Sequence, residues 1–128
     1  MPLVRIDVLA GRSADQLRAM GDGVHAAMVE TIGVPPLDRF QVVTEHPPGR
    51  LVFDPAYLGI RRTEGVVFLQ ITLNAGRTLE QKKALYAAIV RNLVAHAGVR
   101  PEDVLVSLVE VAKENWSFGN GVAQYAPP

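Results

Sequence analysis

The stretch LAGRSADQ, residues 9–16, recurs 65 positions later as NAGRTLEQ, residues 74–81. The likeness continues on both sides of this stretch. When residues 2–46 are laid over residues 67–111 without a gap, 12 of the 45 paired positions are identical. A repeat of this length is a supersecondary unit rather than a short motif that recurs by chance. The sequence therefore predicts a single domain, residues 1–128, that is built from one unit used twice.

Each copy of the unit predicts a strand, a helix and a second strand. Ser13 with Gln16 is the pattern of a capping box, in which two side chains satisfy free N–H groups at a helix start. Thr78 with Gln81 repeats this pattern in the second copy. Each helix then keeps apolar residues at helical spacing until a glycine followed by a proline ends it. The predicted strands cover residues 3–9, 39–45, 66–73 and 104–111.

The connection between the two strands of a unit determines how they pair. Strands joined through a helix lie parallel, with a right-handed crossover that puts the helix on one face. Two such units give an α/β (α+β) fold with a four-stranded mixed sheet and two helices on one face. VVFLQITL (66–73) and VLVSLVEV (104–111) are nearly continuously apolar, which is typical of strands buried on both faces. Because the helices cover only one face, we expect an oligomer that packs the bare sheet faces together.

The segments outside the two units carry weaker signals. The connector PPGRLVFDPAYLGIRRTEG, residues 47–65, is rich in turn-forming residues and predicts one short strand at 51–53. After the second unit, NWSFGNGVAQY contains Asn120 followed by Gly121, which is a strong signal for a two-residue hairpin turn. We therefore expect a C-terminal hairpin over residues 115–126.

Composition limits the classes of partner and cofactor. Lys and Arg together number 13, as do Asp and Glu, and this net charge of zero argues against a nucleic-acid-binding or membrane-surface protein. The chain has no cysteine, and its three histidines lack the spacing of metal ligands, so no metal site and no cofactor are expected. Without a signal peptide or an apolar run of about 18 residues, the expected location is cytoplasmic.

Pro2 raises a chemical question. Proline lacks an N–H group and is tolerated at the first position of a strand, so Pro2 can be purely structural. Removal of Met1, which is common before a small residue, would instead leave proline at the chain terminus. Its free secondary amine could then act as an acid, a base or a nucleophile.

The predicted topology brings two charged residues to Pro2. If the first strand of each unit lies in the middle of the sheet, Pro2 lies beside the start of its parallel partner, just after Asp38. It also lies beside the end of the antiparallel third strand, just before Arg77. Neighbouring strands are about 4.8 Å apart, so the amine, the carboxylate and the guanidinium share one end of the sheet. Pro2, Asp38 and Arg77 are therefore the candidate catalytic residues.

The repeat supplies a comparison at the opposite end of the sheet. There the equivalent residues are Val67, Asp103 and Arg12, a set without an amine. A structural role is open at both ends, because both arginines precede a helix N-cap and both aspartates lie where a loop meets a strand, a place that suits a turn-capping carboxylate.

The residues quoted above resemble a known family. A proline after Met1, two strand-helix-strand units and GRTLEQK at the start of the second helix resemble the tautomerase superfamily. LDRFQVV and WSFGNGVAQY are similar to motifs of its malonate semialdehyde decarboxylase group, and the likeness covers nearly the whole chain. The resemblance implies a homotrimer whose sheets form a central barrel, in agreement with the bare face predicted above.

The resemblance also implies roles for individual residues. Pro2 resembles the catalytic terminal proline, Asp38 its acidic partner and Arg77 the arginine that binds a substrate carboxylate. One position departs from the R-x-R pattern of the better-known decarboxylases, since Ala75 stands where they have a second arginine. The C-terminal aromatic residues, otherwise expected to serve in packing, resemble the wall of the group's apolar pocket: Trp116, Phe118 and Tyr125.

These roles imply a cofactor-independent decarboxylase of a small 3-oxo acid such as malonate semialdehyde, with hydration of an unsaturated acid as a side activity. Protonated Pro2 would stabilise the enolate that forms as carbon dioxide leaves, or neutral Pro2 would form an iminium with the substrate. As a base, Pro2 would instead catalyse enol–keto tautomerisation of a 2-oxo acid. A non-enzymatic, ferredoxin-like ligand-binding module is the third alternative, in which Pro2 has no chemical role.

Overall fold

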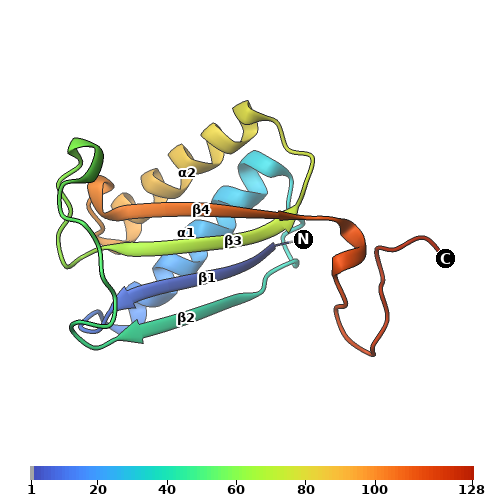
Figure 1. The fold of residues 1–128 in the computed structure, drawn as a ribbon, viewed down its shortest axis with the longest axis horizontal. Coiled ribbons are helices and arrows are strands. Elements are labelled where there is room, and N and C mark those ends of the chain that lie inside the picture. The colour runs from blue at the N-terminus through green and yellow to red at the C-terminus, as the bar shows by residue number, and fades with distance from the viewer. Residues whose placement is uncertain (1) are drawn as a thin grey trace.

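The computed structural model describes residues 2–128, in which the order strand, helix, strand occurs twice (Figure 1). The first unit consists of β1 (Pro2–Leu9), α1 (Ala14–Ile32) and β2 (Gln41–His46). The second unit consists of β3 (Val67–Asn74), α2 (Leu79–Ala97) and β4 (Val104–Val111). Short 3₁₀ helices lie outside these elements: η1 (Tyr57–Gly59), η2 (Pro101–Asp103) and η3 (Lys113–Asn115).

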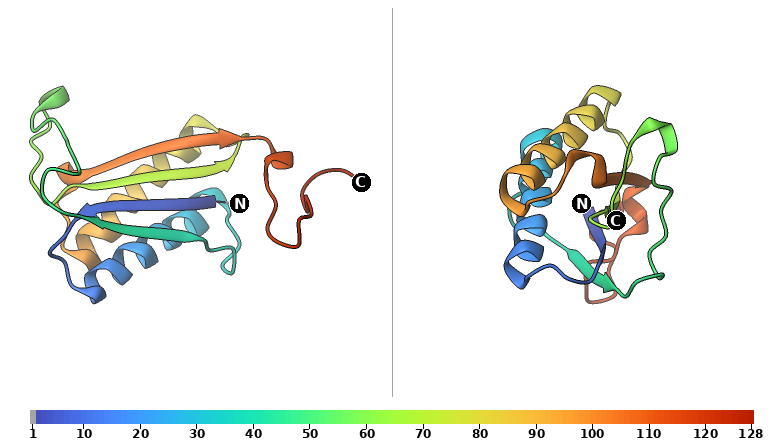
Figure 2. Two further views of the ribbon diagram at one scale, coloured as in Figure 1. Left: turned by 60° about the horizontal axis from the view of Figure 1, so that its bottom comes forward. Right: turned by 90° about the vertical axis from the view of Figure 1, so that its left-hand side faces the viewer.

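The four strands form one mixed sheet in the order β2-β1-β3-β4. β1 pairs with β2 and β3 pairs with β4 in parallel, while the central strands β1 and β3 are antiparallel. The first strand of each unit therefore lies in the middle of the sheet. Both helices lie against the same face of the sheet (Figure 2). The predicted fold, two β-α-β units with both helices on one face of a mixed sheet, is confirmed.

The helix ends are set by local sequence. Ser13 Oγ accepts a hydrogen bond from Gln16 N (3.1 Å), and Gln16 Oε1 accepts one from Ser13 N (3.0 Å), which is the predicted capping box. Thr78 and Gln81 make the same two bonds at the start of α2, at 3.1 and 2.9 Å. Each helix ends at a glycine in the left-handed conformation, with φ of 70° and 65°. The repeated motif therefore determines where both helices begin and end.

The core lies between the sheet and the helices, and it depends on a close approach of α1 to α2. Alternate residues of β1 point into this core, and Val4, Ile6 and Val8 are fully buried. Between the helices, Asn92 Nδ2 donates to Gly23 O (2.9 Å), and a Cβ at position 23 would lie 3.1 Å from Asn92 Cβ. Glycine at 23 thus permits the observed spacing of the helices. No helix within residues 2–128 combines the length and apolar character needed to cross a membrane.

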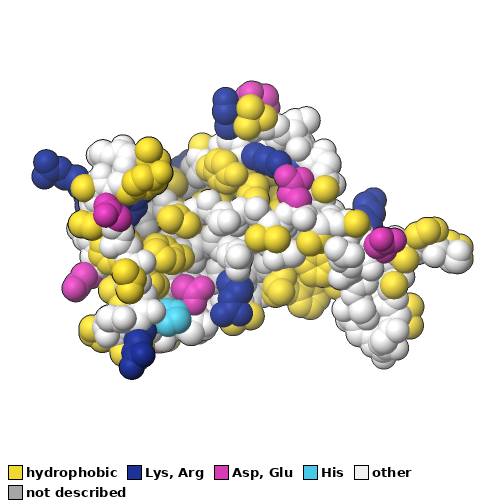
Figure 3. Space-filling view, viewed as in Figure 1, with side chains coloured by type: hydrophobic (Ala, Val, Ile, Leu, Met, Phe, Trp, Pro, Cys, Tyr) yellow, Lys and Arg dark blue, Asp and Glu magenta, His cyan; other side chains and the backbone are white. Residues whose placement is uncertain are grey.

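The other face of the sheet is covered by neither helix. Buried and more exposed residues alternate along β1 and along most of β3, whereas no residue of β4 is buried in the single chain. Burial of β3 and β4 on both faces therefore stays a prediction, because it requires a second copy on the uncovered face. On the uncovered face Gln70 pairs with Ser107, and His46 Nε2 lies 2.7 Å from Asp7 Oδ1. Figure 3 shows this mixture of apolar, polar and charged side chains. Besides the less exposed Phe68, its large apolar residues, each 37–42% exposed, are Leu3, Val42, Leu105 and Val109.

The segments outside the units depart from two predictions. Residues 51–53 are not a strand, although Leu51 is buried; the connector runs through bends and η1 instead. At the C-terminus the predicted turn forms, since φ is 60° at Asn120 and 67° at Gly121, but residues 115–126 do not pair as hairpin strands. The Gln124 side chain closes the turn in place of a ladder, bonding to Phe118 N and Gly119 O, both at 3.0 Å.

Candidate active site

Three segments of the chain meet at the end of the sheet where β1 begins, which we call the Pro2 pole. Pro2 pairs with Leu73 near the end of β3. Val4 N donates to Phe40 O (3.0 Å), just before β2. Asp38 therefore precedes β2 at this pole, and Arg77 follows β3 there, as the predicted topology requires.

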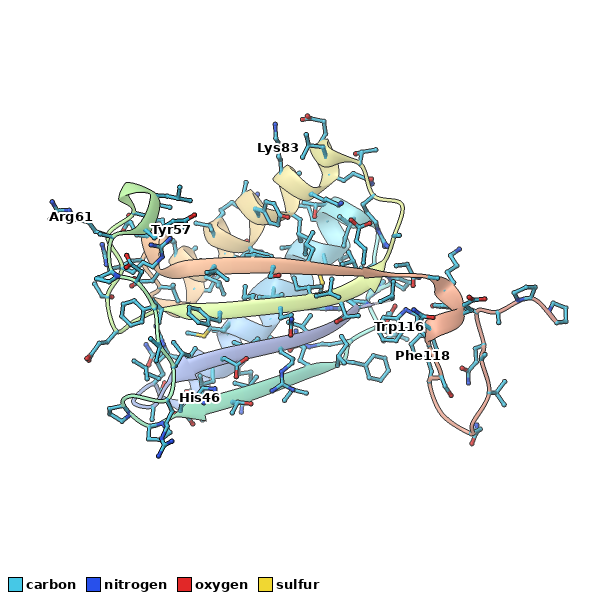
Figure 4. The ribbon with its side chains drawn as sticks, in the orientation of Figure 1. His46, Tyr57, Arg61, Lys83, Trp116 and Phe118 are labelled. Carbon is cyan, nitrogen blue, oxygen red and sulfur yellow. The ribbon has the colours of Figure 1, made fainter. Side chains whose placement is uncertain are left out.

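Aromatic side chains of the C-terminal segment lie over the Pro2 pole. Trp116 stacks on Phe118 with ring centroids 5.5 Å apart, and Phe118 lies 6.4 Å from Phe40. Figure 4 shows Trp116 and Phe118 side by side beyond the end of the sheet. They enclose a cavity of about 270 Å³, the Pro2 cavity, which is lined by Pro2, Leu3, Phe40, Trp116, Ser117 and Phe118. The structure therefore brings Pro2 together with two of the three predicted aromatic residues.

A second cavity of about 530 Å³, the Arg77 cavity, is lined by the loop 74–77 with Gln81, Lys113 and Tyr125. Arg77 Nη1 donates to Asn74 O (3.1 Å) and Nη2 donates to Ile32 O (3.3 Å). A guanidinium carries five N–H groups, so these two bonds leave others that can bind an anion. Arg77 thus holds the loop against the end of α1 and still presents donors to the cavity.

Three C-terminal aromatic rings, which we call the aromatic wall, line the two cavities: Trp116 and Phe118 line the Pro2 cavity, and Tyr125 lines the Arg77 cavity. Asn74, in the lining of the Arg77 cavity, accepts a hydrogen bond through Oδ1 from Trp116 Nε1 (2.8 Å). Phe118, in the Pro2 cavity, makes an edge-to-face contact with Tyr125, whose centroid is 5.0 Å away. The sequence predicts one site for Pro2 and Arg77. In the structure the two residues line different cavities, and the contact between Phe118 and Tyr125 connects the two linings.

Asp38 lies in the loop between α1 and β2. Its N–H donates to Pro35 O (2.9 Å), which fixes a turn before β2. Both carboxylate oxygens are shielded from solvent, although the residue as a whole is half-buried. Asp38 lines neither the Pro2 cavity nor the Arg77 cavity. The question of whether Met1 is removed concerns the one residue outside the described range.

The opposite end of the sheet shows what the repeated acid and cation do there. Asp103 is 3% exposed and accepts hydrogen bonds from Thr63 N (2.8 Å) and Thr63 Oγ1 (2.7 Å). Arg12 Nη2 donates to Gly65 O (2.6 Å). Burial lowers the pKa of Arg12, and the nearby charge of Asp103 opposes this shift. Asp103 and Arg12 therefore hold the end of the connector, at Thr63 and Gly65, where it enters β3. This position before β3 is equivalent to the position before Pro2 in β1.

Sequence reasoning missed three residues of the site. Phe40 lies in the motif LDRFQVV, but an isolated phenylalanine before a strand does not show that it faces a cavity. Asn74 has a usable signal, because the first copy has Leu9 at the equivalent position and a polar residue at the end of a buried strand needs a partner. Lys113 gives no signal in the sequence beyond its charge.

Two family models described as tautomerase enzyme match the chain, one over residues 2–61 and the other over residues 38–119. The probable tautomerase YusQ of Bacillus subtilis (strain 168) is 42% identical over 124 residues, which cover 97% of this chain and 98% of that protein.

Similar solved structures include two malonate semialdehyde decarboxylases. The FG41 enzyme, inhibited by 3-bromopropiolate, has a TM-score of 0.91 at 43% identity, covering 96% of this chain and 93% of that chain. The second, studied for its decarboxylase and hydratase activities, has a TM-score of 0.91 at 38% identity, covering 96% and 95%. A fused 4-OT, a symmetric trimer, has the same fold (TM-score 0.78, 24% identity, covering 96% and 97%). The chain belongs to the family of tautomerase enzymes.

Proposed function

We propose that the chain is a cofactor-independent decarboxylase of a small 3-oxo acid, with Pro2 as the catalytic residue. The observation that carries this proposal is the Pro2 cavity, whose lining is apolar apart from Ser117. When Met1 is removed, the Pro2 amine is the one basic group that this lining offers. The likeness to two malonate semialdehyde decarboxylases over 96% of the chain supports the choice of reaction. Membership of a family of enzymes argues against a ligand-binding module without activity.

The proposed reaction needs a group that accepts electrons. As the bond between C2 and the carboxylate carbon breaks, its electron pair moves through C2 toward the carbonyl oxygen on C3, giving carbon dioxide and an enolate. The protonated amine of Pro2 donates a hydrogen bond to that oxygen, and one preorganised donor of this kind is worth roughly 10²- to 10³-fold in rate. A proton then adds to C2 to give the aldehyde product.

Arg77 and Asp38 have separate tasks in this mechanism. The N–H groups of Arg77 that do not hold the loop bind the substrate carboxylate, by a bidentate contact where both oxygens are within reach. The negative charge of Asp38 favours the protonated form of a nearby amine. Because Pro2 and Arg77 line different cavities, a substrate that contacts both has to extend from one cavity into the other.

Enol–keto tautomerisation of a 2-oxo acid is the second candidate function. Ala75 leaves Arg77 as the only arginine of the loop 74–77, which gives a carboxylate fewer anchors than an R-x-R loop. A relative that covers nearly the whole chain is named as a probable tautomerase. In this reaction neutral Pro2 takes the proton of the enol hydroxyl, and carbon receives a proton as the ketone forms.

Mass spectrometry and two assays test these functions. The intact mass is expected to be that of the chain without Met1. We expect release of carbon dioxide from malonate semialdehyde, with at least about a 10²-fold loss in Pro2→Ala. Pro101→Ala, at the start of η2, is the control and should keep full activity. A higher kcat/KM for ketonisation of phenylpyruvate enol than for decarboxylation of malonate semialdehyde would favour the tautomerase. If Pro2→Ala kept the wild-type rate in both assays, both functions would be refuted.

The pH dependence of kcat/KM separates the roles of Pro2. An acid loses activity as the pH rises through its pKa, whereas a base gains activity. We expect loss at high pH for decarboxylation. Reduction with borohydride during turnover is expected to trap no adduct on Pro2, because the proposed role needs no covalent bond; a trapped adduct would show the iminium route instead.

We also propose that the functional form is a homotrimer. The uncovered sheet face carries four large apolar residues that remain partly exposed, and the fused 4-OT with the same fold is a symmetric trimer. Packing these faces together would remove the exposed apolar groups from water. Light scattering of the purified protein measures its mass in solution and so tests whether it is a trimer.

A further inference from the structure

We propose that Asn74 is a positioning residue, which orients the aromatic wall that lines the two cavities and so controls how a substrate fits beside Pro2 and Arg77. The inference rests on the function proposed above. It adds a residue that does not touch the reacting atoms but acts through Trp116.

Asn74 contacts both sides of the site. Its side chain accepts from Trp116 Nε1 (2.8 Å), while its backbone oxygen accepts from Arg77 Nη1 (3.1 Å). It follows Leu73, the partner of Pro2 in the ladder between β1 and β3. One residue at the end of a central strand therefore fixes the relative positions of the catalytic residue, the cation and the wall.

The burial of Asn74 indicates that its amide is present for this bond. Asn74 is 7% exposed, and a buried amide costs free energy unless it is hydrogen-bonded. The equivalent residue of the first unit is Leu9, at the pole where Val67 replaces Pro2. At this position of the repeat, a polar residue is therefore present only in the copy whose strand ends beside Pro2.

A single hydrogen bond can orient the whole wall because the rings are in contact with one another. The indole of Trp116 has one N–H donor and no acceptor, so the position of its partner restricts the plane of the ring. Trp116 stacks on Phe118 with an interplanar angle of 13°, and Phe118 contacts Tyr125 edge to face. Loss of the bond to Asn74 would free Trp116 and, through it, the rings that line the 270 Å³ and 530 Å³ cavities.

This role predicts a change in substrate preference. In Asn74→Ala we expect kcat/KM for malonate semialdehyde to fall about 2- to 13-fold, which corresponds to loss of one hydrogen bond of about 0.5–1.5 kcal/mol. The loss should be smaller for phenylpyruvate enol, because a loosened wall gives more room to a bulky substrate. The ratio of the two kcat/KM values is therefore expected to shift toward the bulky substrate.

Fluorescence tests the inference without any assay of activity, because Trp116 is the only tryptophan of the chain. We expect emission of Asn74→Ala to shift to longer wavelength and to be quenched more by acrylamide. Asn92→Ala is the matched control. The Asn92 side chain also makes one partly buried hydrogen bond, to Gly23 O (2.9 Å), but Asn92 lies between the helices and away from Trp116. Its emission should stay that of the wild type.

A double-mutant cycle with Trp116→Phe shows whether Asn74 acts through the indole. Trp116→Phe already removes the donor, so adding Asn74→Ala should cost little more, whereas independent effects would add. Additive effects, or unchanged emission in Asn74→Ala, would overturn the inference. If Asn74→Ala does not fold, the kcat/KM of Trp116→Phe tests the inference alone. A kcat/KM equal to that of the wild type would then overturn the inference. A wild-type protein inactive on both substrates would refute the proposed function while the fluorescence result still stood.

Discussion

Asp38 and Asp103 occupy equivalent positions in the two units, yet their surroundings differ. Asp103 accepts two hydrogen bonds from Thr63 and lies 3.5 Å from Arg100, so its charge is used to hold the connector. Asp38 stands at the pole with Pro2, the first residue of β1. The same residue type therefore serves structure at one pole and is proposed to serve chemistry at the other.

Substitution of these two aspartates is expected to separate the roles. Asp38→Asn should lower kcat/KM by about 10²-fold, because the charge that favours a protonated amine is lost, with little change in stability. Asp103→Asn should lower the free energy of unfolding by about 1–3 kcal/mol and keep the activity of the folded protein. Steady-state kinetics and urea unfolding of both variants give the comparison. Equal effects of the two substitutions on both quantities would contradict it.

The two arginines allow a second comparison at this scale. Arg77→Ala is expected to lower kcat/KM about 10- to 150-fold, because a hydrogen bond to a charged group contributes about 1.5–3 kcal/mol. Arg77→Lys should restore only part of the loss, since an ammonium cannot bind a carboxylate through two N–H groups. Arg12→Ala is the control, and it should lower stability through the lost bond to Gly65 O without lowering kcat/KM. A fall in kcat/KM with Arg12→Ala as large as that with Arg77→Ala would refute the difference between the poles.

Single residues of the site were predictable to different degrees. The common position of Pro2, Asp38 and Arg77 at one pole follows from the repeat and from strand pairing, which depend on local patterns. The aromatic wall does not follow from such patterns. The position of Trp116 at the Pro2 pole depends on the path of the C-terminal segment beyond the end of the sheet, and that path is determined by tertiary contacts such as the bond to Asn74.

At the scale of elements, the helices were predictable because short local motifs determine where each helix begins and ends. The capping boxes at Ser13 and Thr78 form as predicted, and so do the glycine ends. The C-terminal hairpin was not, because Asn120 and Gly121 specify a turn but a ladder also needs paired strands on both sides. A side chain, that of Gln124, satisfies the turn instead.

One ionic contact ties two elements and the site loop together, and it predicts a pH dependence. Glu110 of β4 accepts hydrogen bonds from Lys82 of α2 and from the backbone N–H of Gly76, and mainly the bond to Lys82 lowers the pKa of Glu110 below its ordinary 4.5. A carboxylate with a lowered pKa stabilises the fold above pH 4.5, and this contribution is lost as the pH falls through the lowered pKa.

Glu110→Gln should therefore have a lower Tm than the wild type at pH 7, and the two Tm values should converge below pH 4.5. Glu30→Gln, which removes an exposed ion pair with Arg91 (2.8 Å), is the comparison and should change Tm less at pH 7. Thermal unfolding followed by circular dichroism from pH 3 to pH 7 measures both. A Tm difference for Glu110→Gln that stays constant over this range would contradict the assignment.

At the scale of the whole molecule, the exposed apolar residues are not distributed like those of an isolated domain. Besides the uncovered sheet face, the connector exposes Val52 (81%), Tyr57 (65%) and Leu58 (76%). Tyr57 lies at the end of the sheet away from Trp116 and Phe118 (Figure 4). Large apolar groups left in water at both ends and on one face are typical of a surface that meets other copies.

The proposed trimer can be tested with two residues of equal exposure. Leu105 and Val94 are each 42% exposed, but Leu105 lies on the uncovered sheet face and Val94 on α2. In Leu105→Lys a charge would have to be buried between the sheets, which costs free energy unless the charge is paired, so we expect dissociation to monomers. Val94→Lys should leave the assembly intact because its helix face meets solvent. Light scattering over a range of protein concentrations measures both, and a Leu105→Lys protein that stays trimeric would show that the copies associate through another surface.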